Sequence, residues 1–183
     1  MDLTVYFCLR IGFKEHFDPG FHKSYKWDIP LLEGYKHIFL KNYSPSPAPS
    51  FFGQFNPGII RELKKNKYDA IIVHGYTAWT NWFAFLGAWL TKTPIVVKGE
   101  AALSEGAPWW KKFIKKVFLG FMLKRVQAVL YAYKANKDFF RFYGVPEKKL
   151  FFYPCAVNNE FFQRKNKELE GTKQLMKLEI GLK

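Results

Sequence analysis

The stretch that decides the fold is YDAIIVHGYTAWTNWFAFLGAWLTKTPIVVKGEA, residues 68–101. Two short apolar runs, at 70–73 and 94–97, flank a longer apolar segment at 77–90. The short runs are typical of buried strands, and the segment between them is long enough for a helix. This order predicts two parallel strands that are joined by a helical crossover.

The same rhythm extends over most of the chain. Further strand-like runs lie at 3–9, 37–40, 128–131 and 150–153, and further helix-compatible segments lie at 57–67, 108–125 and 134–143. Continuous hydrophobicity in strands that alternate with helices is typical of a mainly parallel sheet covered on both faces. We therefore predict an α/β fold, with a single doubly wound Rossmann-like domain over residues 1–157.

Two segments fall outside this rhythm. SPSPAPSFFG, residues 44–53, is a Pro/Ser-rich connection, and residues 158–183 are mostly charged. We expect residues 158–183 to form a linker or a C-terminal tail. Within them LMKLEIGLK, residues 175–183, is compatible with a helix that leads towards a further strand, and a frayed tail is the alternative.

Composition limits the class of protein. A chain of 183 residues with 49% hydrophobic content can form one domain with a real core. Cys8 and Cys155 lie in separate apolar runs, which suits reduced, buried thiols and favours a cytoplasmic location. The N-terminus lacks the features of a signal peptide, and no apolar run reaches the roughly 20 residues of a membrane span. We expect neither export nor a transmembrane helix.

The net charge of +14 and the aromatic share of 20% are both high. They indicate an acidic polymer, an anionic membrane surface or an anionic substrate as the partner. Nucleic acid, which is one such acidic polymer, is the least favoured partner. No known nucleic-acid-binding module is present, and the lysines are spread over many segments.

Polar residues follow two neighbouring predicted strands. His74 and Gly75 end the first strand, and Lys98, Gly99 and Glu100 end the second. Ligands of doubly wound sheets bind beyond the carboxyl ends of the strands, so we expect these groups to face one crevice. The alternative is a structural histidine and a solvated helix cap.

Several enzyme classes lack their sequence motifs here. No G-x-G-x-x-G follows the first predicted strand, and no G-x-x-x-x-G-K-[ST] or G-x-S-x-G is present. The sequence therefore disfavours a nicotinamide dehydrogenase, a P-loop nucleotidase and an α/β-hydrolase.

The segment 108–125, PWWKKFIKKVFLGFMLKR, predicts a basic amphipathic helix. Its apolar positions 110, 113, 114, 117, 118 and 121 share one face, which we expect to pack on the sheet. A second role is compatible with this packing, namely contact with an anionic membrane. The predicted membrane contacts are Trp109, Lys111, Lys112, Lys115 and Lys116.

Four segments carry a family resemblance: WDIPLLEGYKHIFLKN (27–42), YDAIIVHGY (68–76), PIVVKGEA (94–101) and VQAVLYAYKANKDFFRFYGVPEKKLFFYPCAVNNEFF (126–162). Together they resemble the N-terminal half of the family 4 glycosyltransferases. The resemblance implies the GT-B architecture, in which two Rossmann-like domains face a cleft. It also implies that this chain is the acceptor-side half of an enzyme that transfers a hexose from a nucleotide sugar, without a metal ion or another cofactor.

By this resemblance the acceptor would be a glycan or a lipid-linked sugar, as in polysaccharide biosynthesis, and the enzyme would be cytoplasmic or peripheral on the inner membrane face. Glu100 and His74 are the implied catalytic contacts. The implied acceptor-binding residues are Asp28, Glu33, Gly34, Tyr35, Gly75, Lys98 and Gly99.

The sequence departs from the family pattern in its last segment. The family binds its donor through an E-x(7)-E motif in a C-terminal domain. Glu160 and Glu168 have this spacing, but no Gly-x-Pro follows, so we interpret the match as a coincidence. We expect the chain to be inactive without a separate donor-binding domain or subunit. The alternative is a non-catalytic binding protein that recognises an anionic or carbohydrate ligand.

Overall fold

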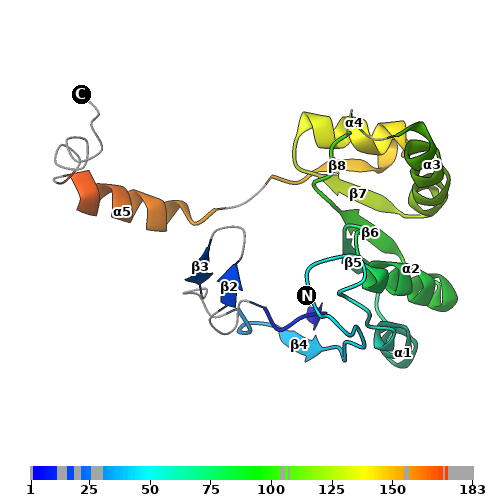
Figure 1. Cartoon of the computed structure of the whole chain (residues 1–183), viewed down its shortest axis with the longest axis horizontal. Helices are drawn as coiled ribbons and strands as arrows, with labels where there is room; N and C mark the ends of the chain where they lie inside the picture. The colour runs from blue at the N-terminus through cyan, green and yellow to red at the C-terminus, as the bar shows by residue number, and fades with distance from the viewer. Residues whose placement is uncertain are drawn as a thin grey trace. The chain divides into compact units, whose positions relative to one another are not determined.

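The computed structural model of the protein describes residues 2–11, 16–18, 22–25, 31–103, 106, 108–154, 157–170 and 172. The chain divides into two compact units, Met1–Tyr153 and Pro154–Lys183. The first unit holds the alternating strands and helices, and the described residues of the second form one helix (Figure 1). Three parts of the sequence predictions, namely Asp28, Cys155 and residues 175–183, lie outside the described residues.

The strands of the first unit form three sheets within the described part of the chain. β1 (Thr4–Phe7) pairs in parallel with β4 (Lys36–Phe39), and β2 (His16–Asp18) pairs in antiparallel with β3 (Lys23–Tyr25). The main sheet is parallel, with the order β5 (Ile71–His74), β6 (Ile95–Lys98), β7 (Ala128–Tyr131) and β8 (Leu150–Phe152). The short β2–β3 hairpin was not predicted, because its residues lack an apolar run.

Helices connect the strands as the sequence predicts. They are α1 (Gly58–Lys65), α2 (Trp79–Thr91), α3 (Trp109–Lys124), α4 (Lys134–Phe142) and the short 3₁₀-helix η1 (Glu147–Lys149). α2 ends where Lys92 adopts a left-handed conformation with φ of 57°. Beyond α4, Gly144 has a φ of 88° and Pro146 prevents the helix from continuing. The predicted α/β, Rossmann-like fold is confirmed.

One buried side chain, Asn56, joins the β1–β4 sheet to the first turn of α2. Its amide nitrogen donates hydrogen bonds to the carbonyl oxygens of Cys8 (3.2 Å) and Leu40 (3.3 Å), which follow β1 and β4. Its side-chain oxygen accepts a hydrogen bond of 2.7 Å from the hydroxyl of Thr80, in the first turn of α2. Because α2 begins just beyond β5, the carboxyl ends of both sheets lie at the same edge of the unit.

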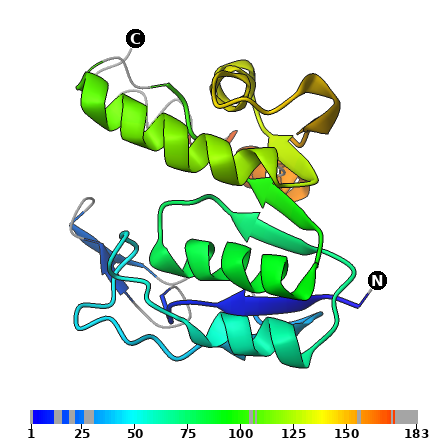
Figure 2. The ribbon, with the colours of Figure 1, turned by 90° about the vertical axis from the view of Figure 1, so that its right-hand side faces the viewer.

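The core lies on one face of the main sheet. Val73, Ile95, Val97 and Val129 of the strands are buried against Phe85 of α2, Met122 and Leu123 of α3, and Phe139 and Phe140 of α4. Figure 2 views the first unit from the side on which α2 and α3 lie. Burying an aromatic or aliphatic side chain contributes about 1.5–3 kcal/mol, so this cluster holds the unit together.

The opposite face of the main sheet is open in the part of the chain that the structure describes. Strand side chains alternate between the two faces, so the neighbours of the buried valines point away from the helices. Among them, Ile72 of β5 is 58% exposed and Phe151 of β8 is 51% exposed. His74 and Lys98 share this open face and lie at its carboxyl edge.

The prediction that the apolar face of α3 packs on the sheet is wrong. The side chains that α3 buries are Leu119, Met122 and Leu123, all in its second half. The predicted packing face is instead exposed, and we call it, with Trp109, the outer stripe. The outer stripe comprises Trp109, Trp110, Phe113, Ile114, Val117, Phe118 and Phe121, which are between 49% and 79% exposed.

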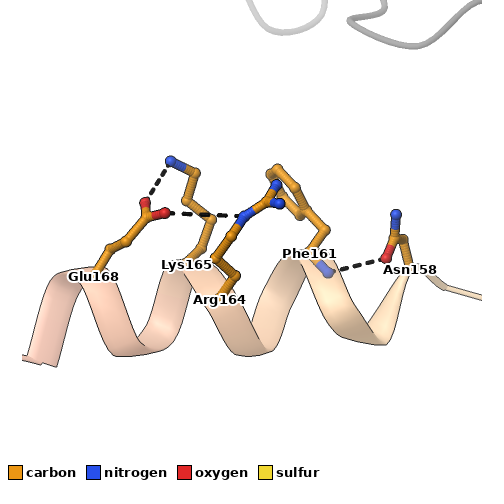
Figure 3. Close-up of polar contacts among 5 residues, drawn as sticks. All are labelled: Asn158, Phe161, Arg164, Lys165 and Glu168. Atoms are coloured by element: carbon orange, nitrogen blue, oxygen red, sulfur yellow. Dashed lines mark hydrogen bonds and ion pairs between the residues drawn. The ribbon is translucent and has the colours of Figure 1, made fainter.

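The second unit contains α5 (Asn159–Glu170) within the range predicted as a charged linker or tail (Figure 3). The side-chain oxygen of Asn158 accepts a hydrogen bond of 2.9 Å from the backbone N–H of Phe161, which caps the helix. None of the described helices is both long and apolar enough to cross a bilayer.

Candidate functional site

His74 and Lys98 occupy neighbouring positions at the carboxyl ends of β5 and β6. The two residues are register partners in the parallel ladder. The backbone N–H of Gly75 donates a 2.6 Å hydrogen bond to the carbonyl oxygen of Lys98, so the two strand ends are joined directly. Gly75 has a φ of 75°, a conformation that favours glycine. The predicted juxtaposition of these two strand ends is therefore present.

β8 adds an aromatic ring to this group. The Nζ atom of Lys98 lies 4.6 Å from the centre of the Tyr153 ring. The backbone N–H of Tyr153 donates a 2.8 Å hydrogen bond to the carbonyl oxygen of Tyr131, which extends the β7–β8 pairing. This geometry is a cation–π contact, and it favours a position of the ammonium group beside the sheet edge.

The segment after β6, which contains Glu100, is held by the start of α4. The hydroxyl of Tyr133 donates a hydrogen bond to the backbone carbonyl of Glu100. Asn136, which is fully buried, donates a 2.8 Å hydrogen bond to the carbonyl of Ala101 and accepts one of 3.1 Å from the N–H of Ala132. Because buried amides keep their hydrogen bonds, Asn136 fixes the position of this loop.

The first turn of α2 holds the other side of the site. The side-chain amide of Asn81 donates hydrogen bonds to the carbonyl oxygens of His74 (2.7 Å) and Gly75 (3.3 Å). The indole N–H of Trp82 donates a 3.0 Å hydrogen bond to the carbonyl of Tyr76. Sequence reasoning found His74 because polar residues end its predicted strand. It missed Asn81, Tyr133 and Asn136, which lie in or directly before the helices that follow the strands.

The surroundings of His74 lower its pKa below the ordinary value. Burial is the largest cause, and the positive charge of Lys98 adds to it, while the carboxylate of Glu100 opposes both. A histidine with a lowered pKa is neutral at pH 7, and a neutral imidazole nitrogen can accept a proton. The site therefore combines a neutral base, a fixed cation and a nearby carboxylate.

A cavity of about 470 Å³ lies at the carboxyl ends of β1 and β4. Its lining includes Phe7, Cys8, Leu9, Arg10, Phe39, Leu40, Lys41, Asn42 and Pro47. The guanidinium of Arg10 lies 4.3 Å from the centre of the Phe39 ring, and burial raises the pKa of the Cys8 thiol. Since Asn56 bonds to the carbonyls of Cys8 and Leu40, this cavity belongs to the same edge of the unit as His74.

The structure does not bring every predicted site residue to this edge. Glu33, Gly34 and Tyr35 directly precede β4, so they lie at its amino end, opposite the cavity. The hydroxyl of Tyr35 donates a hydrogen bond to the carbonyl of Leu31, and Gly34 has a φ of 84°. Asp28 lies outside the described residues. The acceptor-binding role of these four residues stays a prediction.

The predicted membrane lysines fall into two groups. Lys112 and Lys116 are exposed. Lys115 is half-buried, and its Nζ atom lies between 5.0 and 5.6 Å from the centres of the Tyr76, Phe139 and Tyr143 rings. The side chain of Lys111 lies outside the described set.

Glu168, half of the E-x(7)-E spacing, forms ion pairs within its own helix. Its carboxylate lies 2.7 Å from the ammonium of Lys165 and 3.9 Å from the guanidinium of Arg164 (Figure 3). Such pairs are typical of a solvated helix face and fit the interpretation of the spacing as a coincidence. In the described part of the chain, no three His, Cys, Asp or Glu side chains cluster in a way that could hold a metal ion.

Comparison with known proteins agrees with the fold. The family model for Glycosyltransferase Family 4 matches residues 14–161. No curated protein and no solved structure matches the chain. The match covers most of the 183 residues; it includes three of the four segments that carry the resemblance and all but the last residue of the fourth. The chain therefore belongs to glycosyltransferase family 4.

Proposed function

We propose that this chain binds the acceptor for a hexosyl transfer from a nucleotide sugar. The observation that carries the proposal is the juxtaposition of His74, Lys98 and the Glu100 segment at the carboxyl edge of a parallel sheet. Ligands of such sheets bind at this edge. The cavity at the same edge of the unit, with Arg10 and Lys41 in its lining, provides room for a sugar-sized group.

In this proposal His74 and Glu100 contact the acceptor. Transfer requires an acceptor hydroxyl that attacks the anomeric carbon of the donor sugar. The bond from this carbon to the phosphate oxygen breaks, the nucleotide leaves with the bonding electrons, and the hydroxyl loses its proton as the new bond forms. The neutral imidazole of His74 accepts that proton, because burial and Lys98 lower the pKa of the ring. Gly75, Lys98 and Gly99 form the wall of the acceptor site.

The donor half of the reaction is assigned to another domain. Since Glu168 is engaged in ion pairs on α5, the described residues offer no E-x(7)-E donor site. The proposal is therefore that a second Rossmann-like domain, in the same gene or in a separate subunit, binds the nucleotide sugar. The first test is to sequence the source DNA beyond the codon for Lys183 and through the neighbouring reading frame.

Binding of the acceptor can be tested on the chain itself. Saturation-transfer NMR with a panel of glycans and lipid-linked sugars should detect acceptors that bind, whereas nucleotide sugars should give no signal. His74→Gln and Glu100→Gln should weaken acceptor binding. His37→Gln is the matched control, because His37 lies in β4 and outside the site.

The outcomes distinguish two functions. Acceptor binding together with a donor domain that restores transfer would support the glycosyltransferase function. Acceptor binding without any such domain would favour a non-catalytic binding protein. If the variants and the control bound all acceptors equally, the assignment of the site would be wrong.

The proposal extends to the class of acceptor and to location. A lipid-linked sugar, as used in polysaccharide biosynthesis, is presented at a membrane surface. We therefore place the chain in the cytoplasm, peripheral on the inner membrane face.

A further inference from the structure

The outer stripe of α3 is the largest run of exposed apolar side chains on one described helix. Trp109 is 79% exposed, and Phe113 and Phe118 are each 62% exposed. Helices of folded proteins normally turn their apolar face towards the core. Contiguous exposed apolar surface of this kind marks a site of interaction.

α3 covers the core with Leu119, Met122 and Leu123 and presents a second apolar face, the outer stripe, to solvent. Lys115 points towards the core, where its ammonium lies over the Phe139 ring, and Lys116 lies 5.1 Å from the centre of the Phe142 ring. The outer stripe occupies the other side and faces solvent. The lysines thus occupy the polar side of an interfacial helix, while the aromatic side chains are presented outwards.

Charge identifies the occupant of this surface. No acidic residue occurs between Glu105 and Asp138, so every charged side chain of α3 is positive. Two copies of this chain would bring like charges together if they paired through the outer stripe. An anionic lipid surface instead offers hydrocarbon for the stripe and negative headgroups for the lysines.

A second group of positive side chains lies at the C-terminal end of the stripe. Arg125 lies 3.4 Å from the centre of the Phe121 ring, and Phe121 also contacts Trp89. Trp89, Arg125 and Lys92 line a cavity of about 490 Å³. The indole N–H of Trp89 is buried and lacks a hydrogen-bond partner within the described structure. These donors suit a phosphate group beside the last turn of α3.

We propose that α3 lies in the plane of an anionic bilayer, with the outer stripe inserted among the acyl chains. Lys112 and Lys116 contact the headgroups, and Arg125 and Lys92 hold a lipid phosphate at the end of the helix. Lys115 contributes to the core and does not contact lipid. This inference is independent of the acceptor site and of any sugar transfer.

The test is co-sedimentation of the full chain with vesicles of phosphatidylcholine, with and without phosphatidylglycerol. Phe113→Ser with Phe118→Ser should lower the partition coefficient at least about tenfold, because two exposed aromatic side chains no longer enter the bilayer. The matched control is Phe52→Ser, since Phe52 is 72% exposed but lies outside α3.

A pair of charge reversals separates local contact from net charge. Lys112→Glu with Lys116→Glu should lower binding to the anionic vesicles by about tenfold or more. Lys64→Glu with Lys65→Glu changes the net charge equally, but these residues lie in the last turn of α1, so this control should bind nearly as well as the unaltered chain.

Depth of insertion provides a readout that does not depend on affinity. Lipids brominated on their acyl chains should quench tryptophan fluorescence in the unaltered chain, and Trp109→Phe with Trp110→Phe should remove most of that quenching. The proposal is overturned if the stripe variant and the Phe52 control partition equally. It is also overturned if the unaltered chain does not bind vesicles but forms a dimer in solution, and if Phe113→Ser with Phe118→Ser abolishes that dimer.

Discussion

The helices α2 and α3 are both strongly apolar, yet they use their apolar residues in opposite ways. α2 contains no charged residue and buries Phe85, Gly87 and Ala88. α3 carries lysines along its length and exposes seven large apolar side chains, while it buries three in its second half. The comparison teaches that hydrophobic periodicity predicts an apolar face of a helix but does not show whether that face packs against the core.

The largest expected difference between the two helices is in stability. Phe85→Ala should lower the free energy of unfolding by about 3–5 kcal/mol, because it removes a fully buried ring from the core. Phe118→Ala, on the outer stripe, should change it by no more than about 0.5 kcal/mol. Urea denaturation of both variants measures the difference, and equal losses would mean that the stripe is packed.

The close contact between α1 and α2 requires a residue without a side chain at position 87, which is Gly87. A Cβ atom at Gly87 would lie 2.9 Å from a methyl carbon of Leu63 and 3.2 Å from the Cα atom of Ile60. Gly87→Val should therefore destabilise the protein by about 1–3 kcal/mol through overpacking. Gly58→Ala is the control, because a Cβ atom there meets nothing within 4 Å. A thermal melt in which both variants unfold together would contradict this account.

Substitution of Lys115 should have a smaller effect on the free energy of unfolding, and it tests whether this α3 lysine contributes to the core. Lys115→Met keeps the apolar stem and removes the charge above three aromatic rings, so it should cost about 0.5–1 kcal/mol. The same change at Lys64, in the exposed last turn of α1, should have no measurable effect. If the two variants have the same unfolding free energy, the ring contacts do not stabilise the fold.

The smallest expected effect is on the pKa of His74, in the candidate site beside the first turn of α2. Lys98→Met should raise the pKa of His74, because the lysine charge is one cause of its lowered value. Since that folded pKa lies below the ordinary 6.5, protonation favours the unfolded chain, and the His74 contribution to stability falls as the pH drops below 6.5. NMR titration, with His74→Gln to assign the resonance, measures the shift. A fall in the pKa would refute the assigned cause.

Much of this could be predicted from the sequence. Continuous apolar runs located the six parallel strands to within two residues at their ends, and polar residues after two of them located His74 and Lys98. The orientation of α3 could not be predicted, because it depends on which side chains of α4 and β7 fill the core beside it. The hydrogen bonds by which Tyr133 and Asn136 hold the segment after β6 also depend on tertiary placement, since these residues lie more than 30 positions from Glu100 and Ala101 in sequence.

Asn56 has a further consequence for the chemical durability of the protein. Asparagine side chains age by deamidation when the backbone nitrogen of the next residue attacks the amide carbon. Here the next residue is Pro57, whose ring nitrogen carries no hydrogen, so that route is closed. Burial also keeps water away from the amide. The Asn56 side chain, which links the ends of β1 and β4 to α2, is therefore protected against the commonest spontaneous change that would turn it into a charged carboxylate.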